Sequence, residues 1–236
     1  MKNVVILLTG AINVEGVKYV KRYNTRDRIN DYRKSLSEWL KYTNLKIVFV
    51  ENTNYPKNKL FENVSMYSNL EYLTYDGRHF AQERGKGYGE FNIIEYAIKN
   101  STFIRNSDII LKCTGRYKIA YAKKLVEHLQ LSDSLLIGNY NKKLTFIDTR
   151  VIAFTPSFFK LYLSKYKNLI NDEKGFYLEH AFASAGHEML INNNKWEPLP
   201  FPLLIDGISG TSNKHHNKGI KKIEIIVKFY LKKVIC

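Results

Sequence analysis

The sequence of 236 residues is poor in cysteine and has no long apolar run, and each shortage excludes a class of protein. Its two cysteines, Cys113 and Cys236, lie far apart in the chain, so they supply neither a disulfide framework nor a cysteine-rich zinc site. A membrane-spanning helix needs about 20 apolar residues in a row. The apolar segment near the start is shorter than this and lacks a signal-peptide cleavage site. We therefore expect a cytoplasmic protein.

Acidic residues are scarce beside basic ones, because 22 Asp and Glu face 37 Lys and Arg, which gives a net charge of +15. The apolar share of 44% is high enough for a folded core and excludes a disordered chain. A positive field of this size attracts anions. Nucleic acid, an anionic membrane surface and phosphorylated substrates are all candidates on composition alone.

The first half of the chain alternates short apolar runs with a helical pattern. Residues 4–8, 46–50 and 70–75 form apolar runs, and residues 27–42 carry apolar side chains at helical spacing. Strand, helix and strand in this order predict a Rossmann-type α/β sheet. Ligands of such sheets bind beyond the carboxyl ends of the strands. In this sequence the strand ends carry Thr9, Gly10, Glu51 and Asn52.

The second half follows a different pattern. It predicts helices over residues 122–131, 156–166 and 177–185, and short strands over 135–138, 144–147 and 151–154. The last two strands would form a hairpin around residues 148–150, and residues 196–205 would be extended. We expect one domain over residues 1–213, with a nucleotide-binding half at about 1–118 and an acceptor half at about 119–213.

A glycine-rich segment at residues 85–90 precedes a helix expected over residues 91–100. Glycines before a helix let backbone N–H groups approach an anion, and the helix amino end adds favourable partial charge. The segment is neither a Walker loop nor a dinucleotide-binding fingerprint. A plain turn that enters a helix is the alternative. For the anion-binding interpretation, the candidate residues are Lys86, Gly87 and Glu90.

Two cations follow the strand expected at residues 107–116. Lys112 and Arg116 are costly to bury at a strand end unless an anion meets them, and a diphosphate would suit both charges. Thr114 and Gly115 lie between them. The alternative is that Lys112 extends to solvent while Arg116 pairs with a carboxylate.

Two carboxylates are candidates for acid–base chemistry. Transfer onto a hydroxyl needs a base near the attacking oxygen, and Glu179, on a largely apolar helix, would have the raised pKa that such a base requires. Asp148 is a weaker candidate for the base, and Arg150 and His180 are candidate acceptor-binding residues. We expect no metal site in the residues themselves, because adjacent histidines share no helix face and no Asp-x-Asp motif occurs.

The segment 214–236 contains seven lysines and one glutamate. On a helical projection, apolar residues that include Ile223, Val227 and Tyr230 fill one arc, and lysines fill the opposite arc. Ile225 and Phe229 depart from this pattern. A basic amphipathic helix of this kind binds an anionic membrane surface, whereas packing of its apolar stripe on the domain is the alternative.

Together, the polar strand ends, the segment 85–90 and the segment 111–117 resemble small bacterial glycosyltransferases of capsule and O-antigen assembly. The resemblance covers most of residues 3–212. It implies a GT-A-like mixed sheet flanked by helices, a nucleotide-sugar donor with UDP-sugars favoured, and a lipid-linked glycan acceptor. It also implies Glu179 as the base, and a single base favours inversion at the sugar carbon.

The sequence departs from the pattern of this family at the position where many members bind a divalent cation. Many such enzymes carry Asp-x-Asp at the place where this sequence has Lys112 to Arg116. A requirement for Mg²⁺ or Mn²⁺ is therefore left undecided by the sequence. The cations Lys86, Lys112 and Arg116 would neutralise the leaving diphosphate without an ion.

Two other classes of function compete with glycosyl transfer. A nucleotidyltransferase would use the same crevice but need carboxylates to hold its Mg²⁺. A basic nucleic-acid-binding protein would use the charge and the 17 tyrosines. The tyrosines lie mostly in periodic apolar segments, however, and the lysines concentrate in the last segment, so we expect no nucleic-acid partner.

Overall fold

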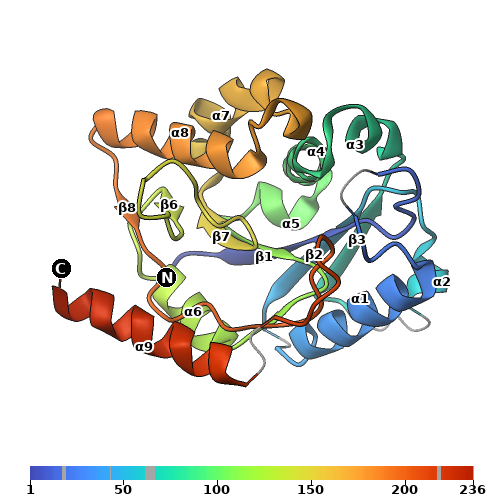
Figure 1. Ribbon diagram of the computed structural model, residues 1–236, viewed down its shortest axis with the longest axis horizontal. Helices are drawn as coiled ribbons and strands as arrows, with labels where there is room; N and C mark the ends of the chain where they lie inside the picture. Colours follow the sequence, from blue (N-terminus) through green and yellow to red (C-terminus); the bar gives the residue numbers. More distant parts are fainter. Residues whose placement is uncertain (18–19, 43, 62–66, 217–218, 236) are drawn as a thin grey trace.

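A mixed sheet of seven strands forms the centre of the computed structural model, which describes residues 1–17, 20–42, 44–61, 67–216 and 219–235 (Figure 1). The sheet has the order β3-β2-β1-β4-β7-β6-β8. Strands β1 to β4 are parallel, whereas β7 runs antiparallel to β4 and β6. The strands of this sheet are β1 (Val4–Gly10), β2 (Lys46–Glu51), β3 (Leu70–Thr74), β4 (Ile109–Thr114), β6 (Leu136–Ile137), β7 (Val151–Phe154) and β8 (Trp196–Glu197). A separate pair joins β5 (Lys118–Ile119) and β9 (Ile205–Asp206).

Helices cover both faces of the sheet (Figure 1). One face carries α1 (Thr25–Trp39) and α6 (Ala122–Leu129), and the other carries α4 (Lys86–Asn100) and α8 (Leu178–Ile191). The other helical elements are α2 (Lys57–Leu60), α3 (Arg78–Arg84), α5 (Thr102–Arg105), α7 (Pro156–Leu161), η2 (Leu163–Leu169), η3 (Asp172–Lys174) and α9 (Ile220–Ile235).

Strand β1 is apolar over most of its length because both of its faces are covered. Ile6 and Leu8 belong to one core with Trp39 of α1, and Leu7 belongs to a second core with Phe91 of α4. Each fully buried side chain of this size contributes about 1.5–3 kcal/mol. The two cores therefore hold the sheet firmly and fix the positions of its carboxyl ends.

The mixed sheet with helices on both faces confirms the expected fold class. The predicted hairpin is wrong, because residues 144–147 form no strand and β7 pairs with β4 and β6 instead. Asn141 closes a turn there, since its side chain accepts the N–H of Thr145 at 3.0 Å. Leu144 has a positive φ of 59° within that turn, which a continuing strand would not allow.

Several helices differ from their predicted bounds, and α8 continues to Ile191, beyond the predicted end at residue 185. Helix α4 begins at Lys86 and not at residue 91, so the glycine-rich segment forms its first turn. Gly85 precedes it with a φ of 92°, a conformation that glycine adopts without strain. The helix predicted over residues 156–166 divides into α7 and the tighter η2.

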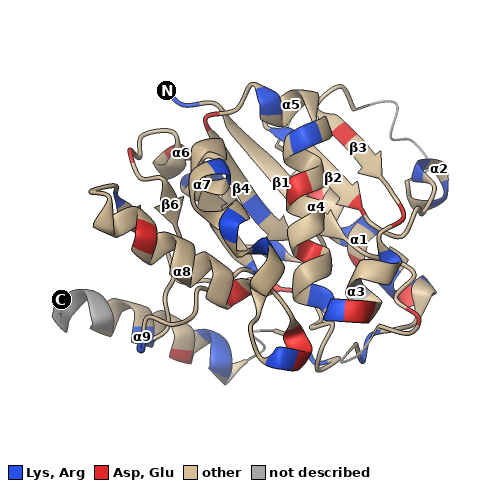
Figure 2. Ribbon diagram, turned by 90° about the horizontal axis from the view of Figure 1, so that it is seen from above, with Lys and Arg blue, Asp and Glu red and all other residues tan. Residues whose placement is uncertain are grey.

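The last segment forms the expected basic amphipathic helix, α9. Figure 2 shows basic residues along this helix. The side chains of Ile223, Val227, Tyr230 and Leu231, on the predicted apolar arc, are between 49% and 63% exposed. This part of the arc is therefore not packed on the domain. Among the described helices, none has an apolar stretch long enough to cross a bilayer. Cys236 lies outside the described residues.

Candidate active site

A cavity of about 300 Å³ lies at the carboxyl ends of β1, β2 and β4. Residues from both halves of the chain line it, which brings together side chains that are far apart in the sequence. Of the residues singled out from the sequence, the cavity is lined by Thr9, Gly10, Asn52, Lys86, Gly87, Glu90, Thr114, Arg116, Arg150 and Glu179. The others, Glu51, Lys112, Gly115, Asp148 and His180, are not among the described residues that line it.

Glu179 lies in the wall of the cavity, in the first turn of α8. The hydroxyl of Thr149 donates a hydrogen bond to its Oε1 at 3.0 Å. Burial raises the pKa of Glu179 above its usual value, and the nearby Glu90 raises it further, whereas Thr149 and Lys112 oppose the change. The side chain is thus anchored, and its raised pKa suits it to accept a proton.

Lys112 lies within the protein rather than in the cavity wall. Its side chain is fully buried in β4, and its ammonium group lies 2.5 Å from Glu90 Oε1 and donates to the backbone oxygen of Thr149 at 2.6 Å. Glu90 also accepts a hydrogen bond from the Thr9 hydroxyl at 2.9 Å. The geometry therefore differs from the predicted direct contact with a diphosphate, because the charge of Lys112 neutralises Glu90.

Glu51 is fully buried, and its carboxylate links backbone segments that follow two neighbouring strands. Its carboxylate accepts the N–H groups of Ile12, Thr53 and Tyr55 at 2.7–3.0 Å. It thereby ties the segment after β1 to the segment after β2. Gly115 has a similar structural part, because a Cβ there would lie 2.7 Å from the backbone oxygen of Thr9.

Arg116 supplies positive charge to the cavity wall. Its Nη1 donates to the backbone oxygen of Ile208 at 2.7 Å, and its buried Nε has no hydrogen-bond partner among the described residues. Arg28, a second buried arginine in the wall, is anchored by the backbone oxygen of Ala11 at 2.7 Å. Burial lowers the pKa of Arg28, and Arg116 lowers it further. An anion beside the two guanidinium groups would relieve this repulsion.

The amino end of α4 faces a carboxylate of the protein itself. The amide of Gly87 donates to Asp172 Oδ2 at 3.2 Å. A Cβ on Gly87 would lie 2.7 Å from Asp172 Oδ1, so this glycine makes room for the carboxylate. The amide expected to bind a substrate phosphate therefore has an internal anion as its partner. The ammonium of Lys86 donates to the Thr211 hydroxyl at 2.5 Å.

The expected acceptor-binding residues lie in two different places. Arg150 lines the cavity and pairs with Asp148, with its Nε 2.9 Å from Asp148 Oδ1. His180 instead accepts the N–H of Tyr177 at 3.0 Å through its Nδ1 and packs against the ring of Phe146. It thus caps the start of α8.

The segment 207–216 returns over the cavity. His216 Nε2 lies 3.1 Å from the Tyr117 hydroxyl, and its ring also packs against that tyrosine. Burial lowers the pKa of His216, and Arg150 and Arg116 lower it further. His216 belongs to the stretch assigned from the sequence to the C-terminal helix, yet it lines the cavity.

Sequence reasoning missed several wall residues, namely Arg28, Tyr32, Tyr117, Thr149, Asp172, Ser209, Gly210, Thr211 and His216. A signal existed for Arg28, which is a charged residue on the same helix side as Tyr32 and Leu36 of the core. Asp172 and His216 lie in segments without periodicity. Only the tertiary fold brings them to the cavity.

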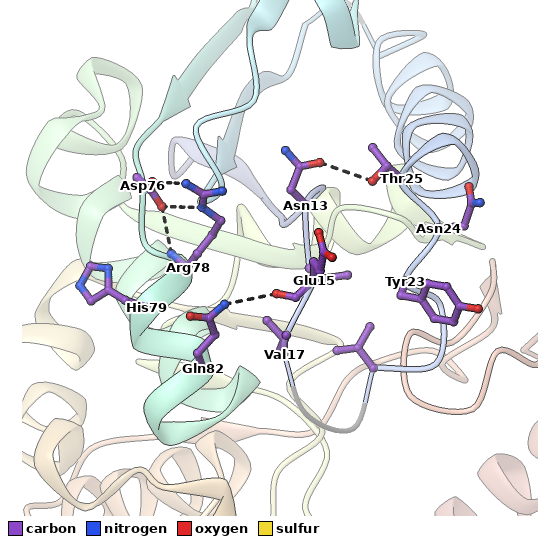
Figure 3. A pocket seen from close by; sticks show the side chains of 13 residues that line it. Asn13, Glu15, Val17, Tyr23, Asn24, Thr25, Asp76, Arg78, His79 and Gln82 are labelled. Atoms are coloured by element: carbon purple, nitrogen blue, oxygen red, sulfur yellow. Dashed lines mark hydrogen bonds and ion pairs between the residues drawn. The ribbon is translucent and has the colours of Figure 1, made fainter.

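A second, open pocket of about 1050 Å³ (Figure 3) adjoins the cavity and shares Asn13, Val14, Val17, Val20 and Arg78 with it. Arg78 pairs with Asp76 inside this pocket. Gln82 donates to the backbone oxygen of Glu15 at 3.2 Å. Its described lining carries the carboxylates of Glu15 and Asp76 besides amide and hydroxyl groups, and its one Lys or Arg there is the paired Arg78.

The side chains at the place of Asp-x-Asp do not fit a divalent ion on a diphosphate. Such ions take carboxylate oxygens, whereas this chain has the buried ammonium of Lys112 and the buried thiol of Cys113. Burial raises the pKa of Cys113 to about 12, so it remains a thiol. Among the described residues, no three His, Cys, Asp or Glu side chains lie close enough together to hold a metal ion.

Comparison with solved structures finds similar folds in proteins of 10–14% sequence identity, a likeness that concerns the fold alone. The inositol-1-phosphate CTP transferase from T. maritima is 14% identical, with 97% of this chain and 96% of that chain covered at a TM-score of 0.50. Galactosyltransferase LgtC is 13% identical over 76% of this chain and 69% of that one, at a TM-score of 0.47. A glycosyltransferase involved in glycosylation of the major capsid of PBCV-1 is 10% identical over 82% and 81%, at 0.45. No family model and no curated protein sequence matches the chain.

Proposed function

We propose that this protein is a glycosyltransferase that moves a sugar from a nucleoside diphosphate to a hydroxyl group. UDP-sugars are the favoured donors, and the acceptor is a lipid-linked oligosaccharide in the synthesis of a surface polysaccharide such as a capsule or O-antigen. Transfer would invert the configuration at the sugar carbon. No step in this proposal requires a metal ion or a nucleic acid.

The observation that carries the proposal is the charge of the cavity together with the anchored carboxylate in its wall. Among the described lining residues, five Lys or Arg side chains face three Asp or Glu side chains. Arg78 and Arg150 pair with Asp76 and Asp148, which are not in that lining, and the buried Lys112 neutralises Glu90, so the excess is one positive charge. A cavity with a positive excess attracts a diphosphate. Glu179 adds what a phosphate-binding site alone would not need, a carboxylate whose pKa is raised by burial.

The proposed reaction is a single displacement. Glu179 accepts the proton of the acceptor hydroxyl while the oxygen of that hydroxyl forms a bond to the anomeric carbon of the sugar. The bond from this carbon to the diphosphate oxygen breaks, and its electron pair leaves with the nucleoside diphosphate. Arg116 stabilises the charge that develops on the leaving group, with Lys86 near the same cavity.

Helix α9 supports the proposed lipid-linked acceptor. Its exposed apolar side chains, Ile223, Val227 and Tyr230, lie on a helix that also carries Lys221 and Lys222. Apolar burial and attraction to anionic lipid headgroups both favour an interfacial position for such a helix. We propose that the protein works in the cytoplasm, attached to the inner face of the cell membrane through α9.

Cytidylyl transfer is the second candidate, because the T. maritima CTP transferase matches nearly the whole chain. That reaction joins a nucleotide to a substrate phosphate or hydroxyl and releases pyrophosphate. It would use CTP and not a nucleotide sugar. The two candidates therefore predict different ligands for the same cavity.

The test is a thermal-shift screen of the full chain against CTP and against UDP-, GDP-, CMP- and dTDP-sugars, each with and without Mn²⁺. A ligand that binds the folded state raises the unfolding temperature. We expect stabilisation by a nucleotide sugar with no dependence on Mn²⁺. Turnover should be lost in Glu179→Gln with donor binding retained, whereas Glu127→Gln on the exposed side of α6 should change neither. Stabilisation by CTP alone would favour cytidylyl transfer.

A further inference from the structure

Lys112 is a fully buried cation that the proposed reaction does not use. It lies within the sheet, on β4, beside Leu7 of β1 and Ile152 of β7. Its ammonium group contacts the Glu90 carboxylate at 2.5 Å and donates to the backbone oxygen of Thr149 at 2.6 Å. Apolar side chains of similar volume commonly stabilise a protein as well as a buried ion pair does. A charged pair at the centre of the sheet therefore points to a purpose other than stability.

Both partners of the Lys112 ammonium group lead to the cavity. Glu90 lines the cavity from α4, and its Oε1 also accepts the Thr9 hydroxyl at 2.9 Å. Thr149 lies in the cavity wall just before β7, and its hydroxyl donates to Glu179 Oε1 at 3.0 Å. One buried ammonium group thus holds a second carboxylate of the cavity and also the residue that anchors Glu179.

The hydrogen bonds of Thr149 join β4 to the first turn of α8. Its backbone oxygen is held by Lys112, and its side-chain hydroxyl is held by Glu179. Threonine is branched at Cβ, so its side chain has few rotamers once the backbone is fixed. The hydroxyl therefore keeps one direction, and the position of the Glu179 carboxylate follows from a strand of the sheet as well as from its own helix.

The same pair sets the charge around Glu179. Burial is the main cause that raises the pKa of Glu179, the charge of Glu90 raises it further, and Lys112 lowers it. Two carboxylates in one cavity repel each other, and a cation between them relieves that repulsion. Without Lys112, Glu179 would hold its proton to a higher pH.

The other charged groups around Glu179 have partners of their own. Hydrogen bonding with Asp148 is the main cause that raises the pKa of Arg150, and the charge of Glu179 makes a smaller contribution. His180, the next residue on α8, accepts the N–H of Tyr177 at 3.0 Å. The charge balance at Glu179 therefore depends chiefly on the buried pair.

We propose that Lys112 is a positioning residue for Glu179, which holds Thr149 toward that carboxylate and balances the negative charge of Glu90 beside it. The inference rests on the proposed glycosyl transfer for the role of Glu179 as the base. Lys112 thus serves the reaction through Thr149 and Glu90, without the contact to a diphosphate that the sequence predicted.

The test is a direct titration of the Glu179 carboxyl group by NMR, in the full chain labelled with ¹³C-glutamate and with the signal assigned from Glu179→Gln. Lys112→Met removes the balancing cation and the hydrogen bond to Thr149, so we expect the titration midpoint to rise by about one pH unit or more. Glu90→Gln removes the repelling charge and keeps the cation, so the midpoint should fall. The double variant of Lys112→Met and Glu90→Gln should lie within about half a unit of the wild type.

A matched control removes a different ion pair from the same helix. Lys167 lies 2.7 Å from Glu95 of α4. Lys167→Met should leave the midpoint of Glu179 unchanged, because neither partner of this pair contacts Thr149 or lines the cavity among the described residues. The control separates the charge balance at Glu179 from a general loosening of α4.

Two results would contradict the proposal. An unchanged midpoint in Lys112→Met and Glu90→Gln, or a shift in the same direction in both, would mean that the pair only stabilises the fold. Because the expected shifts have opposite signs, Glu90→Gln decides the matter by itself if Lys112→Met does not fold. Full turnover in Glu179→Gln, with the midpoints moving as expected, would instead overturn Glu179 as the base and with it the proposed reaction.

Discussion

The two sides of the cavity are built in different ways. On the β1 to β4 side, Thr9 lies near the end of β1 and Asn52 follows β2, and the apolar residues of these parallel strands are buried in two cores. On the opposite side, Asp172 begins a short 3₁₀ turn and His216 belongs to a returning loop. The first side is positioned by the sheet. The second is positioned by individual hydrogen bonds to the first, such as that from Gly87 to Asp172.

This difference suggests a division of labour. Groups at the ends of packed strands move little, which suits binding of the invariant nucleotide part of a donor. Groups on turns and loops can change among related proteins without disturbing the core. Such groups suit recognition of the sugar and the acceptor, which differ from one transferase to another.

The largest effect is expected where the two sides join. Lys112 connects Glu90 of α4 to the backbone just before β7. Lys112→Met would leave Glu90 without its ion-pair partner, and we expect the free energy of unfolding in urea to fall by about 3 kcal/mol. Lys41→Met, which removes an exposed pair with Glu38, should leave it unchanged within error. Equal stability of both variants would mean that the buried pair does not hold the two sides together.

The next effect concerns the leaving group. Arg116→Ala should lower kcat/KM by about 100-fold, because a cation beside the developing diphosphate charge would be lost. Arg84 provides a matched control, since it stacks on the ring of Tyr88 and is not among the described lining residues. Steady-state kinetics of Arg84→Ala should stay within about twofold of wild type. Similar losses in the two variants would remove the proposed role of Arg116.

The sequence predicted the strand side better than the loop side for a physical reason. A buried strand and the polar residue at its end are neighbours in the chain, so Thr9, Asn52 and Thr114 could be assigned from local pattern alone. Asp172 reaches the cavity only because α4 and α8 pack together, which no local pattern encodes. Lys112 illustrates a second limit. Its place near the end of a buried strand was predicted, whereas its ion-pair partner Glu90 was expected to bind the donor. The start of α4 was misplaced because glycines within a first helical turn read as a loop.

A smaller effect tests how Thr149, just before β7, influences the pKa of the proposed base Glu179. Glu179 must lose its proton to act, and burial raises its pKa, so activity should rise with pH through a value above that of an ordinary glutamate. The Thr149 hydroxyl opposes this rise. Thr149→Val should therefore move the acidic limb of the kcat profile to higher pH, and Thr149→Ser should restore it. If the acidic limb is the same in all three proteins, it does not report the ionisation of Glu179.

The smallest effect on the fold is expected at α9, where the exposed apolar arc contributes little to the core. The double variant Ile223→Ser and Tyr230→Ser should keep its unfolding temperature and its turnover of a soluble acceptor, because neither residue is among the described lining of the cavity. Its attachment to vesicles that contain anionic lipid should fall several-fold in a sedimentation assay. Leu161→Ser, at an exposed apolar residue on α7, is the control that should bind as wild type does. If the double variant sediments like the wild type, the membrane proposal loses its support. If instead it unfolds at a lower temperature, the apolar side chains of α9 pack on the domain and contribute to its stability.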